Sequence, residues 1–193
     1  MSLKDFLRYS LMLAALCVFA GTAAAQGPVF DNDTTTSNLE MTATVQTAVQ
    51  LNISTGAGGA TVSGNSATGL FSIAFGNVNG LGLGTPTAGV TVVVDSSGAL
   101  YKTPINLTPV YSGFDTETAD ITVEAGTSGN ENLAREGNSG ISSGSTVGAS
   151  PVSVISNAAS GSNNERFVGF YIPRSEVTGA KTATLIYTIT VQL

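Results

Sequence analysis

The sequence predicts an all-β protein, built as a single antiparallel β-sandwich. Two observations lead to this prediction. Apolar and polar residues alternate with a period of two near both ends of the chain, which is the pattern of strands that bury one face. Between these ends, short runs rich in β-branched residues are separated by turns of glycine, asparagine and serine. No amphipathic helix of about ten or more residues is evident.

Residues 1–25 are predicted to be an export signal that is cleaved from the mature chain. Lys4 and Arg8 give a basic start, the apolar run after them is too short to span a bilayer as a helix, and the alanines at 23–25 suit a cleavage site. The single cysteine, Cys17, lies in the apolar run, so the mature chain is expected to have none. We expect an exported protein of the periplasm, cell surface or extracellular space of a bacterium or archaeon, with no membrane span in the mature chain.

The mature chain is expected to comprise a polar N-terminal arm at residues 26–38 and a β-sandwich domain at 39–193. The first strand is predicted at Met41–Ile53 and the last at Thr182–Leu193, because both alternate. A Gly- and Ser-rich loop is expected near 126–150, either bare or containing one edge strand. The strands between the two ends are predicted at Leu70–Phe75, Val90–Val94, Leu100–Tyr111, Ala119–Ala125, Pro151–Ile155 and Arg166–Ile172.

The composition excludes several kinds of chemistry. The chain has no histidine, no tryptophan and one cysteine, which excludes Ser-His-Asp catalysis, imidazole metal sites and an intrachain disulfide. Seven basic residues against 13 acidic ones give a net charge of -6, which argues against a nucleic-acid partner because phosphate binding needs Lys and Arg. We therefore predict a protein that is not an enzyme, with no catalytic residues, no cofactor and no metal site.

Two features of the sequence suggest a binding site, one for calcium and one for phosphate, but a structural interpretation is favoured for both. Asp115, Glu117 and Asp120 cluster between two predicted strands, where carboxylates suit calcium, but the spacing of a calcium loop is absent and a solvated turn is favoured. The segment 80–84 alternates Gly and Leu in the manner of a phosphate loop, but it lacks the Lys and the following helix.

The expected strand at 41–53 suggests a role in assembly. It is longer than the roughly five or six residues usual in a sandwich, so part of it is expected to extend beyond its own domain. An apolar-faced strand of this kind can pair with an open sheet edge of a neighbour, and head-to-tail addition builds a filament because it does not close. We expect protein partners, either further copies or other surface subunits. The alternative, in which both terminal strands belong to one monomeric sandwich, stays open.

Four parts of the sequence resemble a known group of proteins: the signal with alanines at 23–25, the early strand Thr42–Ile53, the segment Phe71–Val78 and the closing strand Gly179–Leu193. Together they resemble the exported bacterial β-sandwich proteins of the pilin and spore-coat-U-like type. The resemblance implies an Ig-like or pilin-like sandwich with a structural or adhesive role and no catalytic residues to transfer. Chaperone–usher pilins usually carry a disulfide, which the mature chain lacks, so the resemblance does not imply the usher pathway.

Two other functions stay open at this point. An outer-membrane β-barrel has similar alternating strands, and the hydrophobic row from Tyr187 to Leu193 partly matches the last strand of such barrels, although the chain has few aromatic residues for membrane girdles. A secreted carbohydrate- or calcium-binding module would use the loops that follow the strands.

Overall fold

A computed structural model describes residues 40–44, 46–113 and 118–192. The predicted signal at 1–25 and the predicted arm at 26–38 therefore lie outside the described residues. The chain divides into two compact units, Met1–Ala43 and Thr44–Leu193. The four described residues of the first unit, 40–43, are exposed and belong to no strand or helix. All described strands lie in the second unit.

The second unit confirms the predicted all-β class. Its described residues form twelve strands and one short 3-10 helix, with no α-helix. The chain is rich in threonine and valine, whose branched side chains fit the pleated surface of a sheet better than a helix. In chain order the elements are β1 (Ala48–Thr55), β2 (Val62–Asn65), β3 (Leu70–Ile73), β4 (Gly76–Asn77), β5 (Thr85–Pro86), β6 (Thr91–Val94), β7 (Gly98–Ser112), β8 (Thr118–Ala125), η1 (Glu131–Leu133), β9 (Ala134–Gly137), β10 (Val152–Ala158), β11 (Asn164–Pro173) and β12 (Leu185–Gln192).

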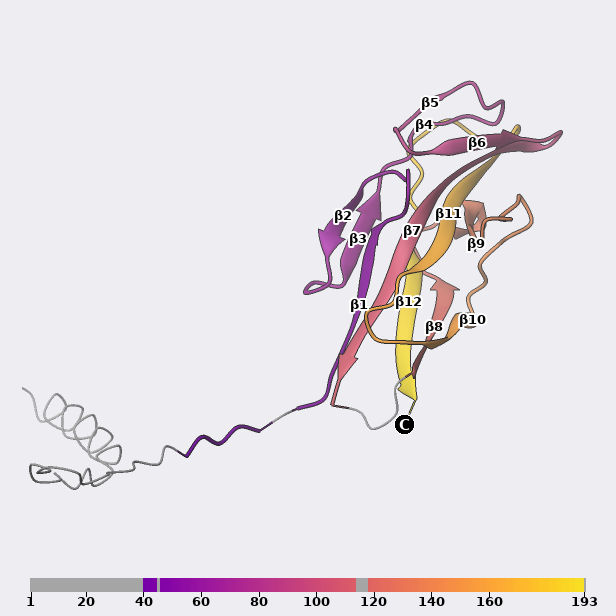
Figure 1. Cartoon of the computed structure of the whole chain (residues 1–193). Coiled ribbons are helices and arrows are strands. Elements are labelled where there is room, and N and C mark those ends of the chain that lie inside the picture. The colour runs from indigo at the N-terminus through magenta and orange to yellow at the C-terminus, as the bar shows by residue number, and fades with distance from the viewer. Residues whose placement is uncertain (1–39, 45, 114–117, 193) are drawn as a thin grey trace, which may run out of the picture. The chain divides into compact units, whose positions relative to one another are not determined.

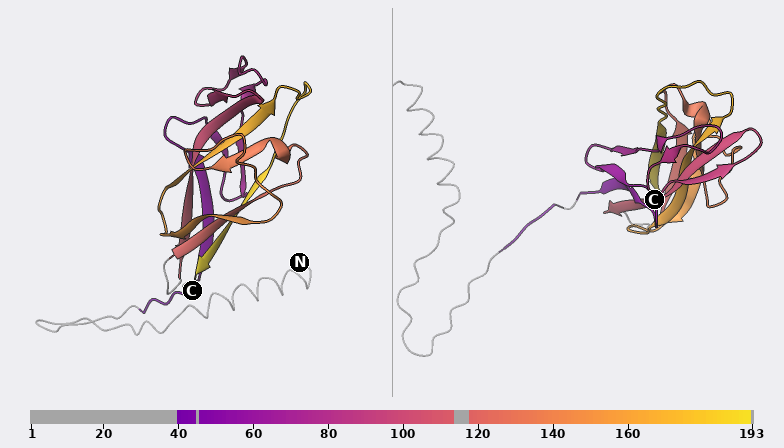
Figure 2. Two further views of the ribbon diagram at one scale, coloured as in Figure 1. Left: turned by 90° about the vertical axis from the view of Figure 1, so that its right-hand side faces the viewer. Right: turned by 90° about the horizontal axis from the view of Figure 1, so that it is seen from above.

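The strands form two main antiparallel sheets and two small hairpins (Figure 1). The larger sheet has the order β1-β7-β11-β9, and β6 also pairs with β7. The smaller sheet has the order β10-β8-β12. Two views at right angles show the two sheets as layers of a β-sandwich-like body (Figure 2). Among the described residues neither sheet closes on itself, and the outer side of β9 carries a bridge between Arg135 and Thr146.

The core lies between the two sheets and is centred on β7. The side chains of Tyr101, Thr103, Ile105 and Leu107 alternate along β7 and are almost fully buried. Ile105 and Leu107 pack against Ile121 of β8 across the sandwich, which joins the two sheets through one cluster. Burial of an aliphatic side chain of this size contributes about 1.5–3 kcal/mol, so this shared cluster holds the two layers together.

The segment near 126–150 contains an edge strand and is packed onto the body. It forms η1 and β9, and β9 pairs with β11 at one edge of the larger sheet. Leu133 and Ile141 are buried. The Arg135 guanidinium donates hydrogen bonds to the carbonyl oxygens of Asn132, Ala134 and Ser143 at 2.6–2.7 Å. Burial lowers the pKa of Arg135, and its guanidinium lies 5.2 Å from the ring centroid of Tyr171.

The first strand is shorter than the sequence predicted. The alternation indicated a strand over Met41–Ile53, but β1 begins only at Ala48. The cause lies in its partner, because Ala48 is paired with Ser112, the last residue of β7. Residues before Ala48 therefore have no β7 residue left to pair with. In the same way β12 begins at Leu185 and not at 182, since Leu185 is paired with Ala125 at the end of β8.

Candidate functional site

Two sheet edges without a backbone partner line one groove. Among the described residues β1 pairs only with β7, and β12 pairs only with β8, so each strand has one free edge. The start of β1 and the end of β12 lie at the same end of the body. Ala48 is paired with Ser112 at the end of β7, and Gln192 is paired with Thr118 at the start of β8. Only a short stretch of sequence separates Ser112 from Thr118. The two strands therefore run antiparallel to one another across the groove.

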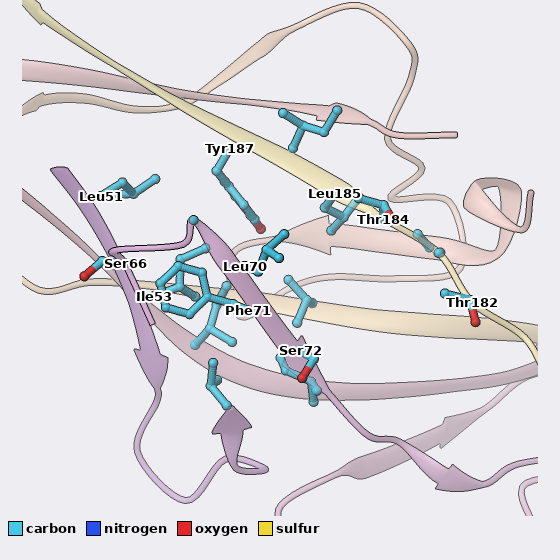
Figure 3. A pocket seen from close by; sticks show the side chains of 18 of the residues that line it. Leu51, Ile53, Ser66, Leu70, Phe71, Ser72, Thr182, Thr184, Leu185 and Tyr187 are labelled. Atoms are coloured by element: carbon cyan, nitrogen blue, oxygen red, sulfur yellow. The ribbon is translucent and has the colours of Figure 1, made fainter. Parts of the chain in front are cut away.

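The groove has a volume of about 750 Å³ and an apolar lining. The groove is open to solvent, so this volume is a hollow at the surface and not a void inside the core. It is bounded by β1, β12, the β2–β3 hairpin and the inner face of β11 (Figure 3). The side chains around it come from Val49, Gln50, Leu51, Ile53, Val62, Ser66, Leu70, Phe71, Ser72, Ile73, Phe75, Ile105, Ala134, Val168, Phe170, Thr182, Ala183, Thr184, Leu185, Ile186, Tyr187 and Ile189.

No charged residue belongs to this lining. The absence of charge extends beyond the groove, since the sequence contains no Asp, Glu, Lys or Arg between Glu40 and Asp95. That stretch includes β1 and the β2–β3 hairpin. An occupant that buries a charge in the groove would lose hydration without gaining an ion pair, which is costly. The groove therefore suits a neutral, largely apolar occupant.

One buried polar group lines the groove without a partner. The hydroxyl oxygen of Tyr187 is buried and has no hydrogen-bond partner among the described residues. Burial raises the pKa of Tyr187 well above its ordinary value, and the nearby Glu136 carboxylate acts in the same direction. Glu136 itself is ion-paired with Arg166, 2.7 Å apart. Buried hydroxyl groups are normally hydrogen-bonded, so Tyr187 is an exception among the buried side chains of the described residues.

The described residues just before β1 have the character of a free strand. Residues 40–44 and 46–47 are all exposed and outside any strand, and Met41 is 84% exposed. Their sequence alternates, with Met41, Ala43 and Thr47 in one row and Thr42 and Thr44 in the other. An alternating segment with no partner strand leaves a row of apolar side chains in water.

The acidic cluster considered for calcium is only partly described. Asp115 and Glu117 lie outside the described residues. Asp120 accepts hydrogen bonds from the Asn157 backbone N–H at 3.0 Å and from the Gln192 side-chain amide at 2.6 Å. In the described part of the chain no three Asp, Glu, Cys or His side chains are grouped closely enough to hold a metal ion.

The Gly-Leu alternation at 80–84 lies in a turn that hydrogen bonds hold in place. The Asn79 side-chain oxygen accepts hydrogen bonds from the backbone N–H groups of Leu81 and Leu83, at 3.0 and 3.1 Å. The Tyr101 hydroxyl holds the turn from below, since it accepts from the Asn79 N–H at 3.0 Å and donates to the Asn79 carbonyl at 2.9 Å. These hydrogen bonds give residues 80–84 a role in the structure of the turn that does not depend on a phosphate.

The two described lysines are engaged elsewhere in the structure. Lys102 donates to the Ser139 carbonyl at 3.2 Å and lies over the Phe167 ring, and Lys181 is ion-paired with Glu176. Sequence reasoning did not single out the β2–β3 hairpin, the free edge of β12 or the Tyr187 hydroxyl. The predicted strand Leu70–Phe75 covers β3, whereas β2 was not predicted. Gly64, Asn65 and Gly69 were a local signal for the hairpin, because such residues favour a tight reversal.

Comparison with known proteins adds no relative. No family model, no curated protein and no solved structure matches the chain. In the described residues, none of the helical segments has the length and apolar character required to cross a membrane. The class that the fold and groove define is thus an all-β, β-sandwich-like domain with an open apolar groove between two free strand edges.

Proposed function

We propose that this chain is a non-catalytic exported structural or adhesive protein of the cell surface, and that it forms a filament in which one copy adds a strand to the groove of the next. The observation that supports this most is the groove itself, with its apolar lining and the unpaired edges of β1 and β12. Strand addition to a free edge supplies backbone hydrogen bonds, and alternate side chains fill the apolar space beneath.

The segment at 40–47 has the properties that this groove requires. Its odd positions, Met41, Ala43, Val45 and Thr47, place mostly apolar side chains on one face, and its even positions from Thr42 to Gln46 are polar. Only Glu40, at its outer end, is charged. The segment is as long as β12, which has 8 residues. Burial of a side chain such as that of Met41 contributes about 1.5–3 kcal/mol, which gives the addition a driving force.

The direction of the strands favours addition between copies. The segment leaves β1 at the end of the body where β12 finishes. To enter its own groove it would have to reverse direction at once, but Gln46 and Thr47 are not residues that favour a tight turn. In a second copy stacked head to tail, the same segment enters from the opposite end without reversal. It then runs antiparallel to β12, the more stable pairing.

Head-to-tail addition leaves one free segment and one empty groove at the two ends of every assembly. Each added copy regenerates both, so the contact is heterologous and does not close on itself. A linear filament is the expected product. An exported filament of this kind suits a structural or adhesive role, which is also the role that the resemblance to pilin-type proteins implies.

A pair of charge variants tests the proposal. Met41→Asp/Ala43→Asp places two carboxylates on the row that would enter the groove, whereas Thr42→Asp/Thr44→Asp places the same charges on the opposite row. Light scattering and electron microscopy of the exported proteins measure assembly. We expect the first variant to stay monomeric and the second to form filaments as the unaltered chain does. Equal assembly of the two variants, or an unaltered chain that stays monomeric at high concentration, would contradict the proposal.

A further inference from the structure

The β2–β3 hairpin lies over the groove that the proposed function uses. β2 and β3 pair only with each other among the described residues, through the register Val62–Ile73 to Asn65–Leu70. An isolated two-stranded hairpin is marginally stable in water, so this one depends on packing against the body. The packing is uneven: Val62 and Ile73 at its root contact the core cluster, whereas Leu70 near its tip is 73% exposed.

The root of the hairpin is firmly attached to the body. The Ala60 backbone N–H donates to the buried Thr103 hydroxyl at 2.7 Å, and that hydroxyl donates to the Gly89 carbonyl at 3.1 Å. The Val62 N–H donates to the Thr55 hydroxyl at 2.9 Å. Ala60 is fully buried. These contacts fix the point at which the chain leaves the body.

The tip is attached far less strongly. Between the hairpin residues 63–73 and the rest of the described chain, the hydrogen bond found is the one from the Gln50 side-chain amide to the Ser66 hydroxyl. The remaining hydrogen bonds of the tip are internal, from Thr68 and Gly69 back to the turn at Asn65 and Ser66. This exposed bond contributes only about 0.5–1.5 kcal/mol, so hydrogen bonding adds little to the free energy needed to separate the tip from the body.

The tip also occupies the approach to the free edge of β12. Leu70 and Phe71 from β3 line the groove together with Ile53 of β1 and with Leu185 and Tyr187 of β12 (Figure 3). A strand that pairs with β12 needs the space directly beside that edge, about 4.8 Å from it. The hairpin side chains that reach over the groove stand where the side chains of such a strand would lie.

We propose that the β2–β3 hairpin is a displaceable cover of the groove, which swings on its root and must open before a strand from a second copy can pair with β12. This inference rests on the proposed function. The exposure of Leu70 and the single hydrogen bond from the tip to β1 support it, because a cover held in this way loses few contacts when it opens. In a single copy the cover shields the apolar lining from water, and in the assembly the added strand takes over that role.

A cross-link across the tip tests the cover directly. Gln50→Cys/Ser66→Cys, in a Cys17→Ala background, places two thiols at the hydrogen-bonded contact between tip and body. A short bis-maleimide with an internal disulfide then bridges them, and a reductant opens the bridge again. The chain is expressed from its full sequence and purified as exported, and assembly is followed by light scattering. We expect at least a tenfold loss of assembly when the bridge is closed and full recovery when it is opened.

The controls separate this inference from the proposed function. The single variants Gln50→Cys and Ser66→Cys, treated with the same reagent, carry the modification without a bridge and should assemble normally. Assembly of the bridged protein at the rate of the unbridged protein would overturn the cover while leaving strand addition intact. If unbridged and unaltered chains also stay monomeric, the proposed function fails and the cover fails with it.

Amide hydrogen exchange gives a second test that does not depend on assembly. In the monomer we expect the backbone amides of Val62–Asn65 and Leu70–Ile73 to exchange at least a hundredfold faster than the core amides of β7, because opening of the cover is a local event. Protection of the hairpin equal to that of β7 would mean that it opens only when the whole domain unfolds, and would overturn the inference.

Discussion

Arg166 on β11 and Glu136 on β9 form a two-point ion pair inside the sandwich. Arg166 Nε donates to Glu136 Oε1 at 2.7 Å and Nη2 donates to Oε2 at 3.0 Å. Their side chains are 16% and 4% exposed. Hydrogen bonding to the Glu136 carboxylate raises the pKa of Arg166, so the guanidinium stays charged at every physiological pH. The pair fixes the β9 edge strand against β11.

Removal of one partner of this pair should be costly. Arg166→Met leaves the Glu136 carboxylate buried without its cation, and the free energy of unfolding should fall by about 3–5 kcal/mol. The double variant Glu136→Leu/Arg166→Met removes both charges and should recover most of that loss. Urea denaturation measures both values. A double variant no more stable than Arg166→Met would show that the buried charge is not the cause.

Two tyrosines give a matched test of hydrogen bonding. Tyr101→Phe removes the hydroxyl that holds Asn79 through two hydrogen bonds, and should lower the free energy of unfolding by about 1–3 kcal/mol. Tyr187→Phe removes a buried hydroxyl that has no partner among the described residues, so stability should stay the same or rise by about 1 kcal/mol. Thermal unfolding measures both changes. An equal loss in the two variants would show that the Tyr187 hydroxyl is satisfied in the folded protein.

Asp95 should make the protein sensitive to acid. The pKa of Asp95 is lowered, chiefly because the Ser97 backbone N–H donates to its carboxylate at 2.7 Å; the Tyr171 hydroxyl, at 3.0 Å, adds to this. A lowered pKa contributes stability above the unfolded value of about 3.9, and that contribution is lost as the pH falls through the folded value. Asp95→Asn should therefore lower the melting temperature at pH 7 but not at pH 2. Parallel curves for the two proteins across this range would contradict the assignment.

The positions of β7, β11 and β12 were predicted from the sequence, and each of these strands pairs along most of its length with a neighbouring strand. β7 and β11 carry large apolar residues at close spacing because most of their residues are buried or half-buried, and β12 alternates because one face is in solvent. The ends of β1 could not be predicted in the same way. Alternation continues back to Met41, but the length of a strand is set by its partner, and β7 ends opposite Ala48.

The groove depends on information that local patterns do not contain. In the sequence Tyr187 is only one member of a hydrophobic row. That its hydroxyl has no hydrogen-bond partner among the described residues becomes evident only in the folded structure, where β11 and β9 belong to the opposite sheet. Glu136 and Arg166 are thirty residues apart in the chain and meet because β9 pairs with β11. The β2–β3 hairpin has short strands with Gly64 inside β2, which weakens the pattern of alternation.

The most direct measurement of the central claim is amide hydrogen exchange on assembled and monomeric protein, with Met41→Asp/Ala43→Asp as the monomer. Strand addition gives every second backbone amide of residues 41–47 a hydrogen-bond partner on β12 of a second copy, because only those N–H groups face the paired edge. The account predicts that these amides exchange at least tenfold more slowly in the assembly, together with those on the free edge of β12, while exchange in the exposed turn at 127–129 is unchanged. Assemblies in which residues 41–47 exchange as fast as in the monomer would contradict it.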